Sequence, residues 1–491
     1  MAGGEGPAFL AIRMYFLYSV LSAAGVLLLS PYFLIKGLRQ KKYLRNLPER
    51  FAWRFPPELG SYDIEGAPSE ARTRASSTIW IHAVSVGEVL AAVPLASALA
   101  ARFPGWRLVV STTTATGQAL ARERLKSAEA VFYFPLDWRG PVRRALGAVR
   151  PEIVILLETE IWPNFLREAR RAKVPVAVVN GRISNRSFAR FSRALRISGG
   201  LLRGFLRRVL NDAELFVMQS EQDAARLVEL GAQPARVVVA GNMKYDVARP
   251  ESNPLVDWLE GELASKQGRK RDPVLVAGSV IAGEEAPVLE ALAAVSRQWP
   301  GALLVMAPRK PERFDAAAAL IEQSGRRVVR RSTLKLGDAA GARGRHGVLD
   351  CAPGEQGSVL LLDTIGELAA VYRVADVVFV GGSLEPAGGH NPLEPAVFGK
   401  APVFGSSMEN FRDIAALLLR AEAAVEVRSG AELGAAWIAL LSDRERRERL
   451  GRAARELVER NRGATEVTVE RIAALLAEVR KFEPGFEPAH S

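Results

Sequence analysis

The sequence predicts an α/β protein made of two doubly wound domains. From Thr78 onward, short apolar, β-rich runs alternate with helical segments, and each run is nearly continuous in its apolar character. Strands that are buried on both faces of a parallel sheet have this appearance. The alternation breaks once, at residues 246–273, and then resumes. Two successive βα series therefore predict two Rossmann-like domains that face a cleft.

Composition limits the class of protein further. The 491 residues are 48% apolar and 24% charged, which excludes a wholly disordered chain, a collagen-like fibre and a polytopic membrane protein. The single cysteine, Cys351, excludes an internal disulfide and a Cys-rich metal cluster and favours a reducing compartment. The four histidines are too few and too scattered to predict a metal site. The net charge of +12 predicts an anionic partner.

The first fifty residues predict a membrane-anchor helix followed by a basic flank. An uncharged run of 22 residues extends from Met14 to Ile35, and about 20 apolar residues suffice for one helical span. The flank carries six cations against the single carboxylate of Glu49, namely Lys36, Arg39, Lys41, Lys42, Arg45 and Arg50. The positive-inside tendency places this flank and all that follows in the cytoplasm. The same cations suit anionic lipid headgroups.

Other interpretations of this segment remain open at the level of sequence. A cleaved signal peptide is disfavoured because the basic flank follows the apolar run and no small-residue cleavage site is evident. A helix that packs into the globular body, or lies in the membrane interface, is the stronger alternative. A nucleic-acid partner is not expected, because the chain shows no aromatic–basic interleaving and no recognition motif.

Residues 51–250 are expected to form the first domain, after a polar connector at 55–76. Its predicted strands are 78–84, 107–113, 130–136, 152–158, 175–181, 215–220 and 236–242. Residues 251–481 are expected to form the second domain, with a Gly-rich excursion at 332–357, a helical tail from residue 430 and residues 482–491 beyond it. Its predicted strands are 274–279, 302–308, 358–364, 376–383 and 401–406.

A first candidate site is the SVGE sequence, Ser85–Glu88, directly after the strand 78–84. Ligands of open α/β sheets bind beyond the carboxyl ends of the strands, and Glu88 in a first helical turn can accept a proton from an attacking hydroxyl. The alternative is a capping box in which Ser85 and Glu88 only satisfy the helix start. A helix N-terminus also lowers the pKa of a carboxyl group, so a nearby feature must counter that effect if Glu88 is a base.

Two further motifs follow strands of the first domain. Glu158 and Glu160 in LLETEIWPN fall at the end of a strand, where they can point together into the cleft and raise one another's pKa. The alternative is that Glu160 caps the helix that begins near Pro163. Lys244 in GNMKYD follows the last strand, where a compact cation can neutralise a leaving phosphate. On its own Lys244 is a weak signal, because an ordinary lysine is solvated far more often than it is catalytic.

The second domain carries the most specific stretch, EPAGGHNPLEP at residues 385–395. Gly388 and Gly389 permit backbone conformations that other residues avoid, and Asn391 with Pro392 is typical of an N-cap and first helical residue. Such a helix start binds anions. Glu394 either binds a ribose diol or completes a capping box.

Two other second-domain segments also follow strands. Arg309, in APRKPERF, offers a planar donor for phosphate or carboxylate. Backbone groups around Gly366, in DTIGEL, can contact a base or a phosphate. With the 385–395 stretch, these segments converge on one sheet edge, as the parts of a nucleotide site do.

Together these motifs resemble the 3-deoxy-D-manno-octulosonic acid (Kdo) transferase family, from the N-terminal anchor to about residue 425. The matching segments are His82–Glu88, Thr112–Gly117, Glu158–Asn164, Asn180–Ser184, Gly241–Asp246, Pro308–Phe314, Asp363–Leu368, the GGSL…GGHNPLE stretch that ends at Glu394, and Gly405–Phe411. The resemblance implies a GT-B glycosyltransferase that moves Kdo from CMP-Kdo to a lipid A precursor (lipid IVA) at the cytoplasmic face of the inner membrane. That reaction belongs to lipopolysaccharide inner-core biosynthesis.

The resemblance also implies roles for individual residues. Glu88 matches the general base, and Glu158 and Lys244 match groups that stabilise the transition state. The CMP contacts match Pro308 and Arg309, then Ile365, Gly366 and Glu367, and finally Asn391, Pro392, Leu393 and Glu394. One base and no covalent intermediate imply inversion at the anomeric carbon. No cofactor and no metal are expected, because side chains and a helix N-terminus can meet the charge of a monophosphate leaving group.

Two departures from the family pattern keep alternatives open. Residues 279–285 read SVIAGEE where the family shows S-T-H-x-G-E-E, and Lys310 replaces a usual histidine. A GT-B transferase for another nucleotide sugar, or an inactive lipid-A-binding scaffold, would also be consistent with these changes. The sequence does not give the number of Kdo units transferred, the oligomeric state, or whether residues 14–35 span the bilayer or lie along it.

Overall fold

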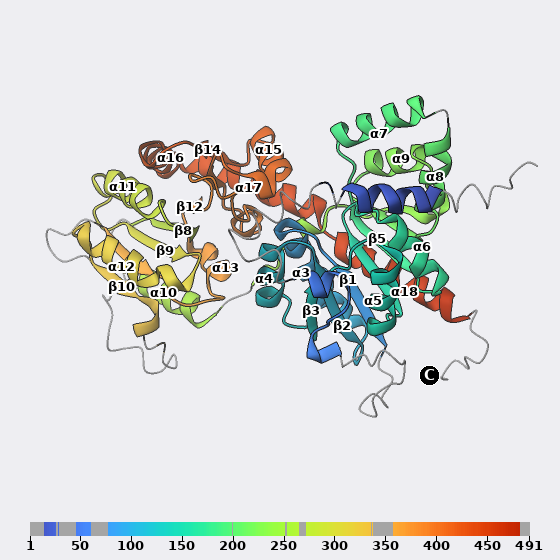
Figure 1. Cartoon of the computed structure of the whole chain (residues 1–491). Helices are drawn as coiled ribbons and strands as arrows, with labels where there is room; N and C mark the ends of the chain where they lie inside the picture. The colour runs from blue at the N-terminus through green and yellow to red at the C-terminus, as the bar shows by residue number, and fades with distance from the viewer. Residues whose placement is uncertain are drawn as a thin grey trace, which may run out of the picture. The chain divides into compact units, whose positions relative to one another are not determined.

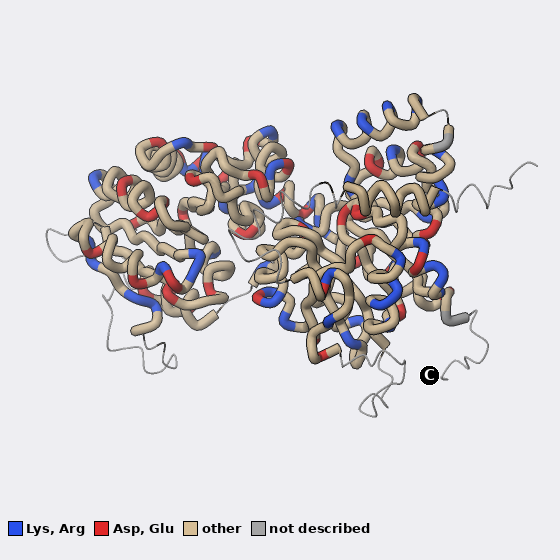
Figure 2. The backbone as a smooth tube through the Cα atoms, in the orientation of Figure 1, with Lys and Arg blue, Asp and Glu red and all other residues tan. Residues whose placement is uncertain are grey.

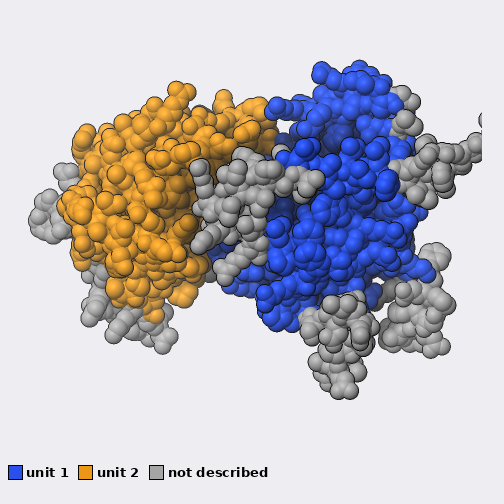
Figure 3. All heavy atoms as spheres, in the orientation of Figure 1, with its two compact units in different colours: residues 1–246, 462–491 blue, residues 247–461 orange. Residues whose placement is uncertain are grey.

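The computed structural model describes residues 14–25, 28, 46–59, 77–198, 200–250, 253–264, 272–334, 336 and 357–481. The chain divides into two compact units (Figure 3). Unit 1 comprises Met1–Asp246 with Arg462–Ser491, and unit 2 comprises Val247–Asn461. Each unit contains one seven-stranded parallel sheet, so the predicted fold class is confirmed.

The sheet of unit 1 has the strand order β3-β2-β1-β4-β5-β6-β7. All seven predicted strands are present, somewhat shorter than expected: β1 (Thr78–His82), β2 (Arg107–Thr112), β3 (Ala130–Tyr133), β4 (Ile153–Leu157), β5 (Val176–Gly181), β6 (Leu215–Met218) and β7 (Val237–Val239). The reversal of strand order between β1 and β4 is the topological switch point at which ligands bind in such sheets.

Helices cover both faces of this sheet (Figure 1). They are α3 (Val86–Arg102), α4 (Ala115–Arg124), α5 (Arg139–Val149), α6 (Pro163–Arg171), α7 (Asn185–Ile197), α8 (Leu201–Leu210), α9 (Glu221–Glu229) and α18 (Ala464–Lys481). Successive residues of β1 enter different cores, because Trp80 packs in one apolar cluster and Ile79 and Ile81 in the other. Burial on both faces explains why the strands lack polar alternation.

The sheet of unit 2 has the order β10-β11-β9-β8-β12-β13-β14. The five predicted strands are confirmed as β8 (Val274–Val280), β9 (Leu303–Pro308), β11 (Ser358–Leu361), β12 (Val377–Val380) and β13 (Pro402–Gly405). Two strands were not predicted, β10 (Val328–Arg330) and β14 (Val425–Val427). Each is a three-residue edge strand that contains a charged residue, Arg330 in β10 and Glu426 in β14, so neither produces an apolar run.

The helices of unit 2 are α10 (Pro254–Ala264), α11 (Glu285–Ser296), α12 (Phe314–Gln323), α13 (Leu368–Val371), α14 (Leu393–Ala396), α15 (Arg412–Arg420), α16 (Gly430–Ser442) and α17 (Arg444–Asn461). Helix α16 packs along α11. Trp437 of α16 is fully buried in the apolar core that also contains Leu275 and Phe379.

The end of the chain corrects the expected domain boundary. The segment 251–481 was predicted to be one domain, but α18 belongs to unit 1, where it packs on α3. The Asp246 carboxylate fastens the start of α18, accepting hydrogen bonds from the backbone N–H groups of Gly463 (2.7 Å) and Thr465 (2.6 Å). The helical periodicity of residues 430–481 predicts helices but not which sheet they cover.

The N-terminal region is described in part. Residues 14–25 are helical. No helix in the described part of the chain is both long enough and apolar enough to span a bilayer. Of the six predicted flank cations, five lie outside the described residues, as do the Gly-rich residues 337–356 and the tail 482–491. The sixth, Arg50, is half-buried, lies 4.7 Å from the centre of the Tyr133 ring and donates to the Thr113 carbonyl. Arg50 is therefore a packing residue rather than a free headgroup ligand.

Candidate active site

Glu88 lies in the first turn of α3, and only 5% of it is exposed. Its two carboxylate oxygens accept hydrogen bonds from the Val84 backbone N–H (2.7 Å) and the Ser85 hydroxyl (2.9 Å). Ser85 is the N-cap residue, but its side chain accepts no backbone hydrogen bond from the helix. A capping box requires that bond, so the alternative interpretation of Ser85 and Glu88 is not the arrangement observed.

The surroundings of Glu88 raise its pKa to about 8. Burial is the largest cause, because it disfavours the charged form. The neighbouring carboxylates of Glu158 and Glu160 act in the same direction, and the hydrogen bonds from Val84 and Ser85 oppose them. Burial and these two carboxylates therefore counter the helix N-terminus, which on its own would lower the pKa of Glu88. A carboxylate with a raised pKa is a stronger base once it is ionised.

Glu158 and Lys244 lie beside Glu88 in unit 1. Glu158 follows the end of β4 with a left-handed backbone (φ 55°), and its carboxylate is 3.8 Å from the Lys244 ammonium nitrogen. A methyl group added to Gly87 would lie 3.5 Å from that nitrogen. The three residues predicted to be catalytic, although 156 positions apart in the sequence, are therefore brought together at the start of α3.

Asn180 and Asn242 position Lys244. Lys244 lies in a short 3₁₀ turn, η4 (Met243–Tyr245), whose Lys244 N–H donates to the Asn242 side chain (3.0 Å). The side-chain oxygen of Asn180 accepts the Met243 N–H (3.1 Å), and Asn180 is 1% exposed with φ 53°. Asn180 begins one of the motifs found in the sequence, but no role was predicted for it. The available signal was an asparagine near the carboxyl end of an otherwise apolar strand.

The helix that follows Glu160 is capped by another residue. Asp137 accepts hydrogen bonds from the backbone N–H groups of Asn164 (3.2 Å) and Phe165 (2.7 Å), in the first turn of α6. The suggestion that Glu160 caps this helix is therefore wrong. Burial, and secondly Glu158, raise the pKa of the Glu160 carboxyl. Glu160 thus adds to the negative field around Glu88.

The predicted nucleotide-binding residues of unit 2 follow three strands of its sheet. Pro308 ends β9, and the backbone N–H of Arg309 donates to the Val280 carbonyl (2.8 Å). Ile365, which follows β11, is 75% exposed, and Gly366 has φ 97°. The Glu367 carboxylate forms an ion pair with the Arg331 guanidinium (2.9 Å), so Arg331 belongs to this group although the sequence analysis did not select it.

The residues at 391–394 differ in detail from the prediction. Helix α14 is four residues long, and Pro392, not Asn391, is its N-cap residue. The Asn391 side chain accepts the Leu393 N–H (3.1 Å). A helix of one turn has little dipole to offer an anion, which removes the physical basis of the predicted helix-terminus cradle. Leu393 is buried. Burial, and secondly the negative charge of Glu394, raise the pKa of Tyr372.

Gly388 and Gly389 have the predicted left-handed backbone, with φ of 88° and 73°. A methyl group on Gly388 would lie 2.5 Å from the Asn410 side chain, and one on Gly389 would lie 2.3 Å from the Met408 sulfur. These glycines therefore allow the 385–395 stretch to pack closely against the segment Gly405–Phe411 that follows β13.

Glu284 organises the loop after β12, and sequence reasoning missed it. Its carboxylate is fully buried and accepts four backbone N–H groups: those of Gly382 (2.7 Å), Ser383 (2.9 Å), Leu384 (2.9 Å) and Ile281 (3.1 Å). The glycine-rich loop 381–384 thus encloses a carboxylate of its own chain. The sequence signal for this role is the Glu-Glu doublet that follows Gly283.

The second glutamate of the doublet joins another motif. Glu285 is 1% exposed, accepts the Gly283 N–H (3.0 Å) and forms an ion pair with Arg313 of the PERF segment (2.6 Å). The departure from the family pattern at residues 280 and 281 therefore leaves both structural glutamates and their partners in place.

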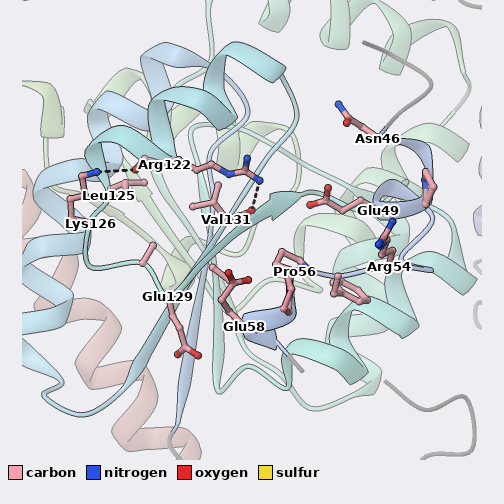
Figure 4. Close-up of a pocket in the computed structure, with 15 residues that line it drawn as sticks. Asn46, Glu49, Arg54, Pro56, Glu58, Arg122, Leu125, Lys126, Glu129 and Val131 are labelled. Atoms are coloured by element: carbon pink, nitrogen blue, oxygen red, sulfur yellow. Dashed lines mark hydrogen bonds between the residues drawn. The ribbon is translucent and has the colours of Figure 1, made fainter. Parts of the chain in front are cut away.

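A cavity of about 660 Å³ lies elsewhere in unit 1 (Figure 4). It is lined by residues 46–58 and by the segment between α4 and the first residues of β3. Arg122 donates to the Val131 carbonyl (3.4 Å) across it. None of the predicted site residues lines this cavity, which lies at the amino end of β3 rather than at the carboxyl ends of the strands. In the described part of the chain, no three His, Cys, Asp or Glu side chains group as metal ligands would.

Known proteins match most of this chain. A family model described as 3-deoxy-D-manno-octulosonic-acid transferase (kdotransferase) matches residues 46–247. A 3-deoxy-D-manno-octulosonic acid transferase of Haemophilus influenzae is 32% identical over 87% of this chain and 91% of its own length. The transferase of that name from Bordetella pertussis is 34% identical over 82% of this chain and 89% of its own length. The crystal structure of the C-terminal CMP-Kdo binding domain of WaaA from Acinetobacter baumannii covers 41% of this chain and 96% of its own, at 29% identity and a TM-score of 0.35.

We predict that Glu88→Gln stabilises the fold at alkaline pH. Because the folded-state pKa of Glu88 is raised from 4.5 to about 8, its favourable protonated form is kept at low pH and lost as the pH rises through 8. Glutamine resembles the protonated form and still accepts from Val84. The gain in unfolding free energy is expected to be about 2–4 kcal/mol at pH 9 and near zero at pH 5. Urea titrations at both pH values measure it. The exposed control Glu229→Gln should change little, and equal gains at pH 5 and 9 would contradict the prediction.

We predict that Glu284→Gln destabilises unit 2. An amide offers one oxygen to the four N–H groups that Glu284 now satisfies, and each buried donor left without an acceptor costs roughly 1–3 kcal/mol. Chemical denaturation should show a loss of about 2–5 kcal/mol, and hydrogen exchange should locate it at the amides of residues 382–384. The exposed Glu290→Gln on the same helix is the control. Unchanged exchange at 382–384 would show that Glu284 does not hold this loop.

Proposed function

The chain belongs to the 3-deoxy-D-manno-octulosonic acid transferase family, and we propose that it moves Kdo from CMP-Kdo to a lipid A precursor with inversion at the anomeric carbon. It is a glycosyltransferase, as its relatives are named. The observation that supports this chemistry best is the grouping of Glu88, Glu158 and Lys244 at the carboxyl ends of the strands in unit 1. That place is where parallel sheets bind their ligands.

Glu88 is the general base of the proposed reaction. The oxygen of an acceptor hydroxyl attacks the anomeric carbon of Kdo while its proton passes to the Glu88 carboxylate. The bond between that carbon and the phosphate oxygen of CMP breaks, and its electron pair leaves with the phosphate. The raised pKa of Glu88 suits this role, because a base whose pKa is near the working pH accepts a proton most effectively.

Lys244 and Glu158 stabilise charge in the same step. The phosphate gains negative charge as it leaves, and an ammonium group that is only 16% exposed acts on such charge through little intervening water. The Glu158 carboxylate, 3.8 Å from that ammonium, fixes its position. The backbone N–H groups of η4 donate to the side-chain oxygens of Asn180 and Asn242, and these bonds hold the lysine in place before substrate arrives.

Unit 2 binds the cytidine nucleotide in this proposal. Pro308–Arg309, residues 365–367 and Asn391–Glu394 follow separate strands of one sheet, and the Arg309 guanidinium offers the donors that a single phosphate needs. A monophosphate leaving group carries less charge than a diphosphate, so the reaction is proposed to need no metal and no cofactor. Glu284 and Glu285 support this site because they connect its loops.

The lipid acceptor sets the proposed location. A lipid A precursor resides in a bilayer, and the net charge of +12 suits a surface of anionic lipid. We therefore place the enzyme at the inner membrane with both units on the cytoplasmic face, acting in lipopolysaccharide inner-core biosynthesis.

The reaction itself is the first test. The full chain, incubated with CMP-Kdo and a tetraacyl disaccharide phosphate, is expected to release CMP and to add the mass of Kdo to the lipid, as measured by mass spectrometry. Glu88→Gln is expected to lower the rate by about 10²–10⁴ with the fold intact, because a general base contributes that much. Glu229→Gln serves as the control. If the wild-type chain leaves CMP-Kdo unused, the assignment of CMP-Kdo as the donor is wrong. If Glu88→Gln remains active, the assignment of Glu88 as the general base is wrong.

The pH dependence of the reaction is the second test. The rate is expected to rise with pH as Glu88 loses its proton, with a limb in kcat/KM near pH 8. Glu160→Gln removes a negative neighbour and should move the limb to lower pH, whereas Ser85→Ala removes a hydroxyl that favours the charged form and should move it to higher pH. Shifts in one common direction, or none, would show that another group controls the profile.

A further inference from the structure

The helix of residues 14–25 turns its polar face toward the rest of unit 1. The Tyr15 hydroxyl donates to Asp212 (2.6 Å), and the Tyr18 hydroxyl donates to Asp137 (2.8 Å). Ser22 accepts from the Trp138 indole N–H (3.1 Å), and Ser19 bonds with Asn164 (3.0 Å). These four residues recur at spacings of three and four, which is one face of a helix. Tyr15 is only 3% exposed, so this face is docked on the protein.

The opposite face of this helix is apolar and exposed. Phe16 is 71%, Leu17 56%, Val20 46% and Leu21 62% exposed. An amphipathic helix on a water-soluble surface has the reverse arrangement, with its apolar stripe against the core. Among the large apolar side chains exposed in the described residues, these four form a contiguous helical stripe, which is typical of an interaction site.

A basic helical hairpin continues this surface. The 27 residues from Asn185 to Asn211, which include α7 and α8, contain seven arginines and no carboxylate. All seven arginines are exposed, namely Arg186, Arg190, Arg193, Arg196, Arg203, Arg207 and Arg208. Phe191 and Ile197 of α7 are exposed among them, at 40% and 79%. Basic side chains mixed with exposed apolar ones suit an anionic lipid surface.

The two features are in contact. Phe205 of α8 packs edge-on against Tyr15, with ring centres 5.2 Å apart, and also lies 6.3 Å from Tyr18. Helices α7 and α8 pack on each other. Figure 2 shows the contrast in charge, with basic positions along α7 and none along residues 14–25. A chain of contacts therefore joins the apolar stripe to the arginine-rich hairpin within unit 1.

We propose that residues 14–25 lie in the plane of a membrane surface, with Phe16, Leu17, Val20 and Leu21 in the lipid, and that the α7–α8 hairpin binds anionic phospholipid headgroups beside them. The occupant is a bilayer because the stripe is apolar while the adjoining α7–α8 hairpin carries seven arginines and no carboxylate, so that a second copy of the same surface would repel it. This inference goes beyond the proposed function, which needs a lipid acceptor but not this surface. It also assigns residues 14–25 an orientation that the sequence left open.

Vesicle binding tests the surface. The full chain should bind vesicles of phosphatidylglycerol and phosphatidylethanolamine more tightly than phosphatidylcholine vesicles, and added salt should weaken the difference. Phe16→Ser with Leu21→Ser should lower binding at least about tenfold, because two apolar side chains leave the lipid. Ile365→Ser, equally exposed but in unit 2, should leave binding unchanged. Arg193→Gln with Arg196→Gln should lower binding to anionic vesicles severalfold, while Arg446→Gln with Arg449→Gln, the same change in net charge on α17, should not.

Depth measurements test the orientation. In a chain with Cys351→Ser, a fluorescent label on Phe16→Cys and one on Ala24→Cys should be quenched equally by lipids spin-labelled at one depth. A spanning helix would separate these positions by about 12 Å along the membrane normal, so clearly different depths would overturn the proposal. The proposal would also be overturned if the changes at residues 16 and 21 left vesicle binding unaffected. It would be overturned as well if the wild-type chain bound no vesicles but formed a dimer in solution that these changes dissociate. Vesicle binding requires no turnover. A failure of the membrane proposal can therefore be distinguished from a failure of the proposed Kdo transfer.

Discussion

The buried carboxylate of Glu88 is the constraint around which unit 1 is arranged. A carboxylate that is 5% exposed at the end of a sheet is unfavourable unless donors reach it, and Glu88 has only two, the Val84 N–H and the Ser85 hydroxyl. Two further carboxylates nearby oppose its ionisation. The Lys244 ammonium pairs with Glu158 rather than directly with Glu88. As a result, the Glu88 carboxyl group loses its proton only near pH 8, and its carboxylate binds a proton strongly enough to act as a base.

Glu284 shows the opposite use of the same side chain. It is also buried near the start of a helix, but four backbone N–H groups satisfy its two oxygens. A carboxylate that is fully hydrogen-bonded stabilises the groups that donate to it. The number of donors, rather than burial, therefore separates a structural glutamate from one suited to chemistry. Glu284 joins the loop after β8 to the loop after β12, and the loop after β12 leads to the predicted nucleotide-binding residues Asn391–Glu394.

Much of this arrangement is predictable from the sequence, for reasons that also define the limits. Twelve strands follow from apolar runs because both sheets are covered on both faces. The short edge strands β10 and β14 leave no such pattern, because Arg330 and Glu426 interrupt them. Glu88, Glu158 and Lys244 follow from motifs at strand ends. The hydrogen bonds of Glu284 to residues 382–384 join segments about 100 positions apart, and those of Asp246 to the start of α18 join segments more than 200 apart. Such distant hydrogen-bond partners cannot be predicted from the residues next to Glu284 or Asp246 in the sequence.

The lack of charge in the N-terminal segment does not by itself give the orientation of the helix of residues 14–25. The uncharged run of 22 residues at positions 14–35 predicts a membrane anchor, but it does not show whether the helix spans the bilayer or lies along it. The informative signal is the spacing of its few polar side chains, because Tyr15, Tyr18, Ser19 and Ser22 fall on one face and each bonds to unit 1. A helix wholly within lipid would bury those hydroxyls where no partner is guaranteed. Their partners on unit 1 also include Asp137, the residue that caps α6 beside the Glu160 loop. The contacts that hold the helix on unit 1 are thus built into the same packing that positions the candidate catalytic carboxylates.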